Sequence, residues 1–371
     1  MENLVRDSLL TFYNICLIAI LILCTKSALS GKIFSKSKTR IIFILCWIFC
    51  VFSFWGADWF SYLKYFLWIK GNNDPANIPM EEFYIWLMTA SNDYLLFRGI
   101  VWGVSLFFFA KILDNLNINK SLALFFFCSI YLIYFSYARA TLAISMMCYG
   151  YSCLWANKSL KKITNNIWGI AWIALSFFFH KSAILGIGSI VYAILLLKFG
   201  KQAFKLLIIC IPFMILLMNV FFQDYLSQIL SEDNTLADYA NASTYYLDEK
   251  KGKLGISTVI SWLLERTPYY LLAYLSLKEL TKPTLRYPDS IKAFIALELI
   301  IVVFASIFLF DFGVNTSTIY GRFMRFAQIP SVIILTYFYS RSVAAPLVRW
   351  TYRIGIAGCL YSLGYSFYDS L

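Results

Sequence analysis

Long uninterrupted runs of apolar residues limit most strongly how this 371-residue chain can fold. Hydrophobic residues make up 60% of the sequence and charged residues only 14%, a balance far from that of water-soluble domains. A bilayer core takes about 20 apolar helical residues per crossing, and only helices and closed barrels satisfy their backbone hydrogen bonds there. Because barrel strands alternate polar and apolar residues and these runs do not, the sequence predicts an all-α polytopic membrane protein.

We expect about twelve membrane-spanning helices, an even number that leaves both termini on one side of the membrane. Two segments on the predicted outer side, about residues 57–94 and 223–256, are longer than simple connectors, and long loops often carry lids or binding residues. We therefore predict a single transmembrane domain, residues 1–371, whose function faces outward. The predicted spans cover residues 8–25, 41–56, 95–113, 121–137, 140–156, 163–180, 182–198, 206–222, 257–277, 291–310, 319–340 and 354–368.

Basic residues are distributed unequally between the predicted loops. The segment KSALSGKIFSKSKTR, residues 26–40, contains five Lys and Arg residues and no acid. If this loop is cytoplasmic, 20 of the 32 Lys and Arg residues lie on the same side, as the positive-inside rule requires. Both termini then lie outside, and the net charge of +12 reports topology rather than a nucleic-acid surface. The nine cysteines have no paired spacing, so neither a disulfide framework nor a zinc site is expected.

Several cations break this pattern, because they lie at or within the outer ends of helices that run inward. A positive side chain is locally unfavourable beside the positive end of a helix dipole. Together, however, guanidinium groups, backbone N–H groups and helix dipoles suit a phosphate or pyrophosphate. Snorkelling of these side chains to lipid headgroups is the alternative. The cations concerned are Arg98, Arg139, Lys181, Arg266, Arg322 and Arg325.

Two of these positions carry further information. Arg322 and Arg325, in GRFMRF, are three residues apart and share one helical face, which suits two neighbouring phosphate oxygens. Arg266 directly follows Glu265, and adjacent helical residues point about 100° apart, so this ion pair needs another partner. Glu298, inside the tenth span, is a candidate for that partner. The alternative for Glu298 is a hydrogen bond between packed helices.

The stretch FFFHKSAI, residues 177–184, contains His180, the only histidine of the chain. Counting 1.5 Å per residue from Lys162 places His180 about 27 Å above the inner boundary, at the level of the outer arginines. An imidazole can there take a proton from an acceptor hydroxyl as a general base. The alternative is an interfacial histidine that is hydrogen-bonded to a neighbouring loop.

Four motifs, in this order, resemble the EpsG/Wzy-type polysaccharide polymerases of bacterial O-antigen, capsule and exopolysaccharide assembly. They are GADWFSYLKYF after the second span, an arginine followed by ATLAIS, FFFHKSAIL, and the late GRFMRF. The resemblance places Asp58 and Tyr62 in a GxD–Y pattern of the family. It also places Arg139 before an alanine-rich helix and His180 in the histidine motif.

The resemblance implies a metal-independent glycosyltransferase without a cofactor, which polymerises undecaprenyl-diphosphate-linked oligosaccharide units at the external face of the bacterial inner membrane. The implied partners are that lipid-linked oligosaccharide, the bilayer, a chain-length regulator and a flippase, with no nucleic acid. The catalytic residues would be His180 and Arg139. Pyrophosphate would be bound by Arg98, Arg266, Arg322 and Arg325, and the glycan would be bound or oriented by Asp58, Tyr62 and Lys181.

Two other classes of protein stay open at this point. A flippase for lipid-linked oligosaccharides also has about twelve spans and a cationic interior, although alternating access usually leaves an internal repeat and short outer loops. An integral-membrane acyltransferase that decorates glycans would also use a histidine and arginines. Its donor chemistry would lie toward the cytoplasmic side, where this sequence offers little beyond loop charges.

Overall fold

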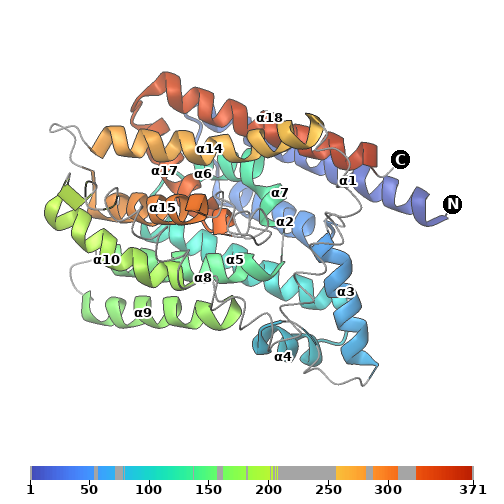
Figure 1. Cartoon of the computed structure of the whole chain (residues 1–371). Helices are drawn as coiled ribbons and strands as arrows, with labels where there is room; N and C mark the ends of the chain where they lie inside the picture. The colour runs from blue at the N-terminus through green and yellow to red at the C-terminus, as the bar shows by residue number, and fades with distance from the viewer. Residues whose placement is uncertain are drawn as a thin grey trace.

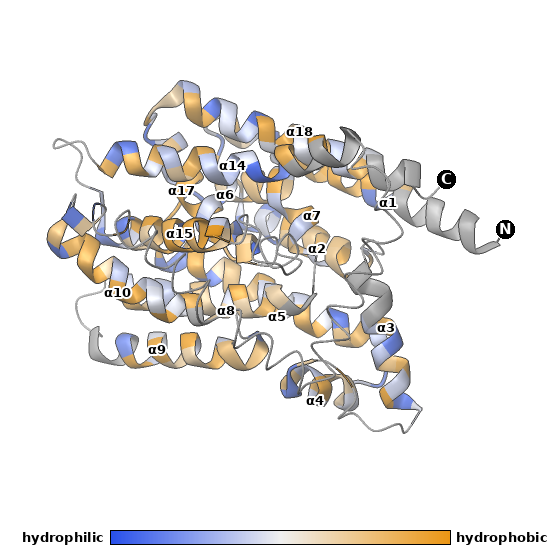
Figure 2. Cartoon of the chain, in the orientation of Figure 1, coloured by the Kyte–Doolittle hydropathy of each residue, from blue (hydrophilic) through white to orange (hydrophobic). Residues whose placement is uncertain are grey.

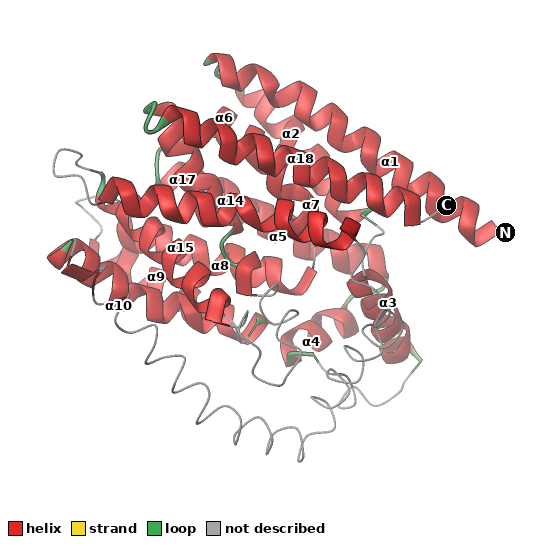
Figure 3. Ribbon diagram, turned by 45° about the horizontal axis from the view of Figure 1, so that its top comes forward, coloured by secondary structure: helices red, strands yellow, loops and turns green. Residues whose placement is uncertain are grey.

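The computed structural model is a bundle of helices that run roughly side by side (Figure 1), without strands in the residues that it describes. These residues are 2–53, 57–71, 78, 80–136, 138–156, 162–180, 183–200, 202, 203, 205, 207, 256–280, 287–307 and 323–369. Figure 3 shows the same bundle from a second direction, again as helices joined by loops. The predicted all-α class is therefore confirmed.

The described helices follow one another along the chain in this order. In the first half they are α1 (Glu2–Thr25), η1 (Lys26–Ser30), α2 (Lys36–Val51), α3 (Ala57–Lys70), α4 (Glu82–Ala90), α5 (Tyr94–Asn115), α6 (Lys120–Phe126), the π-helix η3 (Phe127–Tyr131), α7 (Leu132–Phe135) and α8 (Ala138–Trp155). In the second half they are α9 (Lys162–Phe179), α10 (Ile184–Phe199), α14 (Ile256–Leu280), α15 (Asp289–Ile307), α17 (Gln328–Ser340) and α18 (Ala345–Asp369).

Helix lies at each predicted span except 206–222, which falls almost entirely outside the described residues. By length and composition, three stretches can cross a membrane, namely Phe12–Ser30, Tyr94–Asn115 and Asp289–Ile307. Large apolar side chains of the outer helices, among them Ile167, Phe178 and Val191, are exposed. Figure 2 shows this hydrophobic character along α9 and α10 at the edge of the bundle. Such faces suit lipid contact, whereas the number of twelve spans stays a prediction.

The segment from α6 through η3 to α7 forms the centre of the bundle. All residues from Ser121 to Ser136 are buried, as expected for an element that other helices enclose on every side. The Tyr134 hydroxyl lies 3.1 Å from the Ser362 Oγ and so joins α7 to α18. The sequence did not reveal that η3 is a π-helix, a feature that often marks a functional position within an α-helix.

Two glycines allow α8 and α9 to approach closely. A Cβ atom on Gly150 would lie 2.5 Å from the backbone oxygen of Gly169, and one on Gly169 would lie 2.8 Å from the backbone oxygen of Gly150. In lipid, helices associate through van der Waals packing rather than the hydrophobic effect, so small residues at the interface are valuable. The α8–α9 pair therefore requires both positions to lack a side chain.

Gly150→Ala should lower the thermal stability of the purified protein in detergent, because overpacking costs about 1–3 kcal/mol. The matched control is Gly188→Ala on α10, where a Cβ atom would meet nothing within 4 Å. Alanine also favours helix over glycine, so this control should unfold at the same or a slightly higher temperature. Equal destabilisation of the two variants would contradict the close approach of α8 and α9.

The first of the two segments predicted to lie outside, residues 57–94, differs from the expected loop. Within it, residues 57–70 and 82–90 form the helices α3 and α4. The cation–π contact between the Lys70 Nζ and the Phe66 ring, 5.4 Å from its centroid, lies on α3. The Lys70 Nζ also donates a hydrogen bond of 2.9 Å to the carbonyl oxygen of Thr89 and so links the two helices. The second external segment, residues 223–256, lies outside the described residues apart from Ile256.

The eleventh predicted span, 319–340, is not one continuous helix in its described part. A helical turn at residues 323–325 is followed by a turn at Phe326 and Ala327, and α17 begins at Gln328. Pro330 explains this break, because proline has no N–H for the carbonyl of Phe326, four residues earlier, and its ring clashes with that carbonyl. The break gives Phe326 an orientation that a straight helix would not.

Candidate functional site

His180 lies at the junction of α9 and α10, as the sequence predicted. The backbone N–H of His180 donates to the carbonyl oxygen of Ser176 at 3.1 Å, and the backbone carbonyl of His180 accepts from the N–H of Ala183 at 2.9 Å. These two bonds end α9 and start the turn into α10. Only 7% of the His180 side chain surface is exposed, so its ring is held by its neighbours rather than projecting into solvent.

The His180 ring packs edge-on against the Phe326 ring, with centroids 5.6 Å apart. Phe326 is fully buried and directly follows Arg325, which is half-buried. Two motifs about 145 residues apart in the chain are thereby brought together, the histidine motif and the late arginine motif. This contact is the centre of the candidate site.

Helix α4 packs against the residue next to His180. Phe179, the residue before His180, lies 4.1 Å from Phe83 and 5.8 Å from Tyr84, measured between ring centroids. Tyr84 in turn packs on Phe97 of α5 at 6.4 Å. Aromatic pairs at such distances contribute beyond the area they bury. Through α4, the segment of residues 57–94 therefore packs against the residue that precedes His180.

Arg98 is 99% buried and donates hydrogen bonds to the end of α2. Its Nε donates to the carbonyl of Val51 at 2.9 Å, and its Nη2 donates to the carbonyl of Cys50 at 2.6 Å and to the hydroxyl of Ser53 at 3.2 Å. The last carbonyls of a helix lack intrahelical donors and carry the negative end of the dipole. Arg98 thus acts as a cap of α2, and its predicted contact with pyrophosphate stays a prediction.

Arg98→Ala should destabilise the protein by about 3 kcal/mol, since hydrogen bonds to charged groups contribute about 1.5–3 kcal/mol each and their carbonyl partners would remain buried. Thermal unfolding in detergent measures this effect. Arg353→Ala serves as the control, because Arg353 is an exposed cation that lies 5.9 Å from the Trp350 ring. An Arg98→Ala protein that is as stable as wild type would rule out the capping role.

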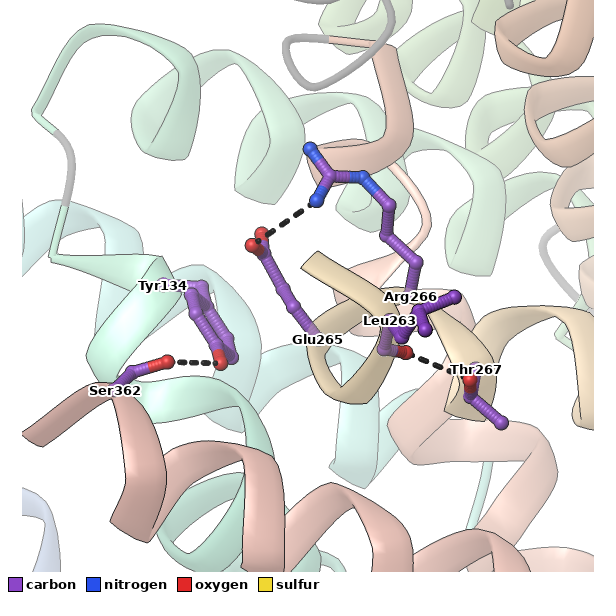
Figure 4. A network of polar contacts seen from close by, with 6 residues as sticks. All are labelled: Tyr134, Leu263, Glu265, Arg266, Thr267 and Ser362. Atoms are coloured by element: carbon purple, nitrogen blue, oxygen red, sulfur yellow. Dashed lines mark hydrogen bonds and ion pairs between the residues drawn. The ribbon is translucent and has the colours of Figure 1, made fainter. Parts of the chain in front are cut away.

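Arg266 and Glu265 form the weak ion pair that their adjacency predicts. The Arg266 Nη1 and the Glu265 Oε2 are 3.6 Å apart, and the side chains are 12% and 28% exposed. Figure 4 shows the Glu265 carboxylate between Arg266 and Tyr134 in this view. Glu298 is not the further partner of Arg266, because its Oε1 accepts a hydrogen bond of 2.6 Å from the Ser331 hydroxyl and its Oε2 has no hydrogen-bond partner in the described part of the chain. That bond between α15 and α17 confirms the alternative expectation for Glu298.

The other predicted site residues are described only in part. Tyr62 of α3 is buried. Asp58 lies in the first turn of α3 and Arg139 is the second residue of α8, but their side chains are outside the description. Lys181 and Arg322 lie outside the described residues altogether. Their predicted roles stay predictions.

Fold and site together define an α-helical membrane protein with a histidine and an arginine motif joined at one end of its bundle. Comparison with known families agrees, since the EpsG family model matches residues 38–368. The chain therefore belongs to the EpsG family, the family of Wzy-type polysaccharide polymerases. Neither a curated protein nor a solved structure gives a match. The match includes every predicted site residue.

Proposed function

We propose that this protein joins undecaprenyl-diphosphate-linked oligosaccharide units into a polysaccharide at the external face of the bacterial inner membrane. The observation that supports this proposal best is the contact of the His180 ring with Phe326, directly after Arg325. In a chain of the EpsG family, the proposed base thus contacts the residue that follows the proposed phosphate-binding arginine. In this proposal the site and both chain termini face the exterior.

The proposed reaction transfers the growing glycan from its lipid diphosphate to a hydroxyl of the incoming unit. His180 removes the proton from this acceptor hydroxyl, whose oxygen then bonds to the anomeric carbon of the donor sugar. The bond between that carbon and the diphosphate oxygen breaks, and the electron pair leaves with the lipid diphosphate. Arg325, Arg322 and Arg139 would stabilise the charge that develops on this leaving group, so the proposal requires no metal ion.

The remaining predicted residues would act around this centre. Asp58, Tyr62 and Lys181 would orient His180 or hold the glycan, and α4 would fix the position of the base through Phe179. A flippase must supply the lipid-linked unit at the outer face, because the headgroup is large and polar. A chain-length regulator is the other proposed partner.

His180→Ala and Arg139→Ala, expressed at normal membrane levels in a strain that lacks this protein, should leave single-unit glycans on the cell surface. Arg325→Ala should have the same effect. Loss of a general base typically costs about 10²–10⁴-fold in rate, which is enough to abolish long chains on a gel of surface glycans. Arg341→Ala is the matched control, an exposed arginine that directly follows α17 at its opposite end.

The same gel separates the proposal from the other classes. A defective flippase would leave no surface glycan, and a defective acyltransferase would leave full-length chains that lack their decoration. Normal long chains from both His180→Ala and Arg139→Ala would show that the proposed site is wrong.

A further inference from the structure

A second group of polar side chains lies inside the bundle, next to the His180–Phe326 contact. Gln328, two residues after Phe326, is 99% buried, yet neither its Nε2 nor its Oε1 has a hydrogen-bond partner. A glutamine side chain can donate two hydrogen bonds and accept two, and each buried group left unsatisfied costs about 1–3 kcal/mol. Native structures rarely leave such a group without a function.

A tyrosine lies next to this amide, and a second tyrosine packs on the first. Tyr269 of α14 lies close to Gln328, and its ring centroid is 5.6 Å from that of Tyr131 in the π-helix η3. Both tyrosines are buried, and the Tyr131 hydroxyl has no hydrogen-bond partner in the described part of the chain. Three elements that are distant in sequence, α14, α17 and η3, therefore bring polar atoms and aromatic rings together.

Glu265 and Arg266 connect this place with the accessible part of the molecule. Glu265 lies one helical turn before Tyr269 on the same face of α14, and its carboxylate interacts electrostatically with Tyr269. Its side chain and that of Arg266 keep part of their surface exposed. Figure 4 shows the contact of Glu265 with Arg266, and in this view Tyr134 lies on the side of the Glu265 carboxylate away from Arg266.

The charge of the group indicates the chemistry of its ligand. The carboxylate of Glu265 balances the guanidinium of Arg266 at 3.6 Å, and the remaining side chains are an amide and phenols. A pyrophosphate requires an excess of positive charge, which this group lacks. Carboxylate, amide and phenol groups beside aromatic rings suit an uncharged ligand rich in hydroxyl groups, which takes few directed hydrogen bonds and apolar contact.

We propose that Glu265, Arg266, Tyr269 and Gln328 form a saccharide subsite that holds a sugar residue of the lipid-linked substrate. This inference rests on the proposed function, and it changes the role of Arg266 from a pyrophosphate ligand to a sugar ligand. Glu265 accepts hydrogen bonds from sugar hydroxyls, and Gln328 both donates and accepts them. Because Gln328 follows Phe326 so closely, a sugar in the subsite lies beside the base that acts on it.

Binding of two probes to full-length protein in nanodiscs tests this subsite. One probe is undecaprenyl diphosphate, and the other is the lipid-linked saccharide pool extracted from cells that lack this protein. Gln328→Leu should weaken binding of the saccharide-bearing probe about 10-fold, the effect of one or two hydrogen bonds, and should leave binding of undecaprenyl diphosphate unchanged. Tyr269→Phe, which removes only a hydroxyl, should act in the same direction and provides the test if Gln328→Leu does not fold.

Glu279→Gln is the matched control, because Glu279 is a buried carboxylate at the other end of α14 that accepts a hydrogen bond of 3.1 Å from Tyr287. It should bind both probes as wild type does. Equal weakening of both probes by Gln328→Leu and Tyr269→Phe, or weakening of neither, would overturn the subsite.

Failure of the subsite and failure of the proposed function give different results. If wild type makes long chains and the subsite variants bind both probes normally, the subsite is wrong and the proposed function stands. If wild type binds the saccharide-bearing probe more tightly than undecaprenyl diphosphate, and Gln328→Leu removes this difference, the subsite stands. If the same wild-type protein makes no polymer in cells, the proposed function is wrong.

Discussion

The packing of the His180 ring against Phe326 is the interaction on which the rest of the site depends. It requires two departures from straight helices. α9 ends at Phe179 with a tight turn through His180, and α17 cannot extend back through Phe326 because Pro330 denies its carbonyl a donor. Each turn directs a ring toward the other. The packing of Phe179 on Phe83 of α4 then holds the residue next to His180 in place.

The arginines predicted to lie at the outer ends of helices are not equivalent in the folded protein. Arg98 is buried and donates to the final carbonyls of α2, whereas Arg266 shares its charge with Glu265. Arg325 lies directly before the residue that touches His180. In the proposed site Arg325 binds the diphosphate, whereas the group around Gln328 and Tyr269 binds a sugar.

Hydropathy alone predicted the all-α class and placed His180 at a helix junction, because the bilayer makes apolar length a direct measure of helix length. The weak Glu265–Arg266 pair also followed from local geometry. The Arg98 cap, the close approach of Gly150 and Gly169, and the position of Phe326 did not follow, since each depends on a segment far away in the sequence. The π-helix at Phe127–Tyr131 could not be predicted either, because its apolar residues resemble those of any buried helix.

A structure of the protein in nanodiscs with bound undecaprenyl diphosphate, determined by electron cryomicroscopy, tests the central claim most directly. The account predicts density for the diphosphate beside Arg325, within reach of a hydroxyl that the His180 imidazole can contact. The Gln328 side should remain free of this ligand, because undecaprenyl diphosphate has no sugar. A diphosphate bound near Arg341, at the junction between the end of α17 and the start of α18, would contradict the account.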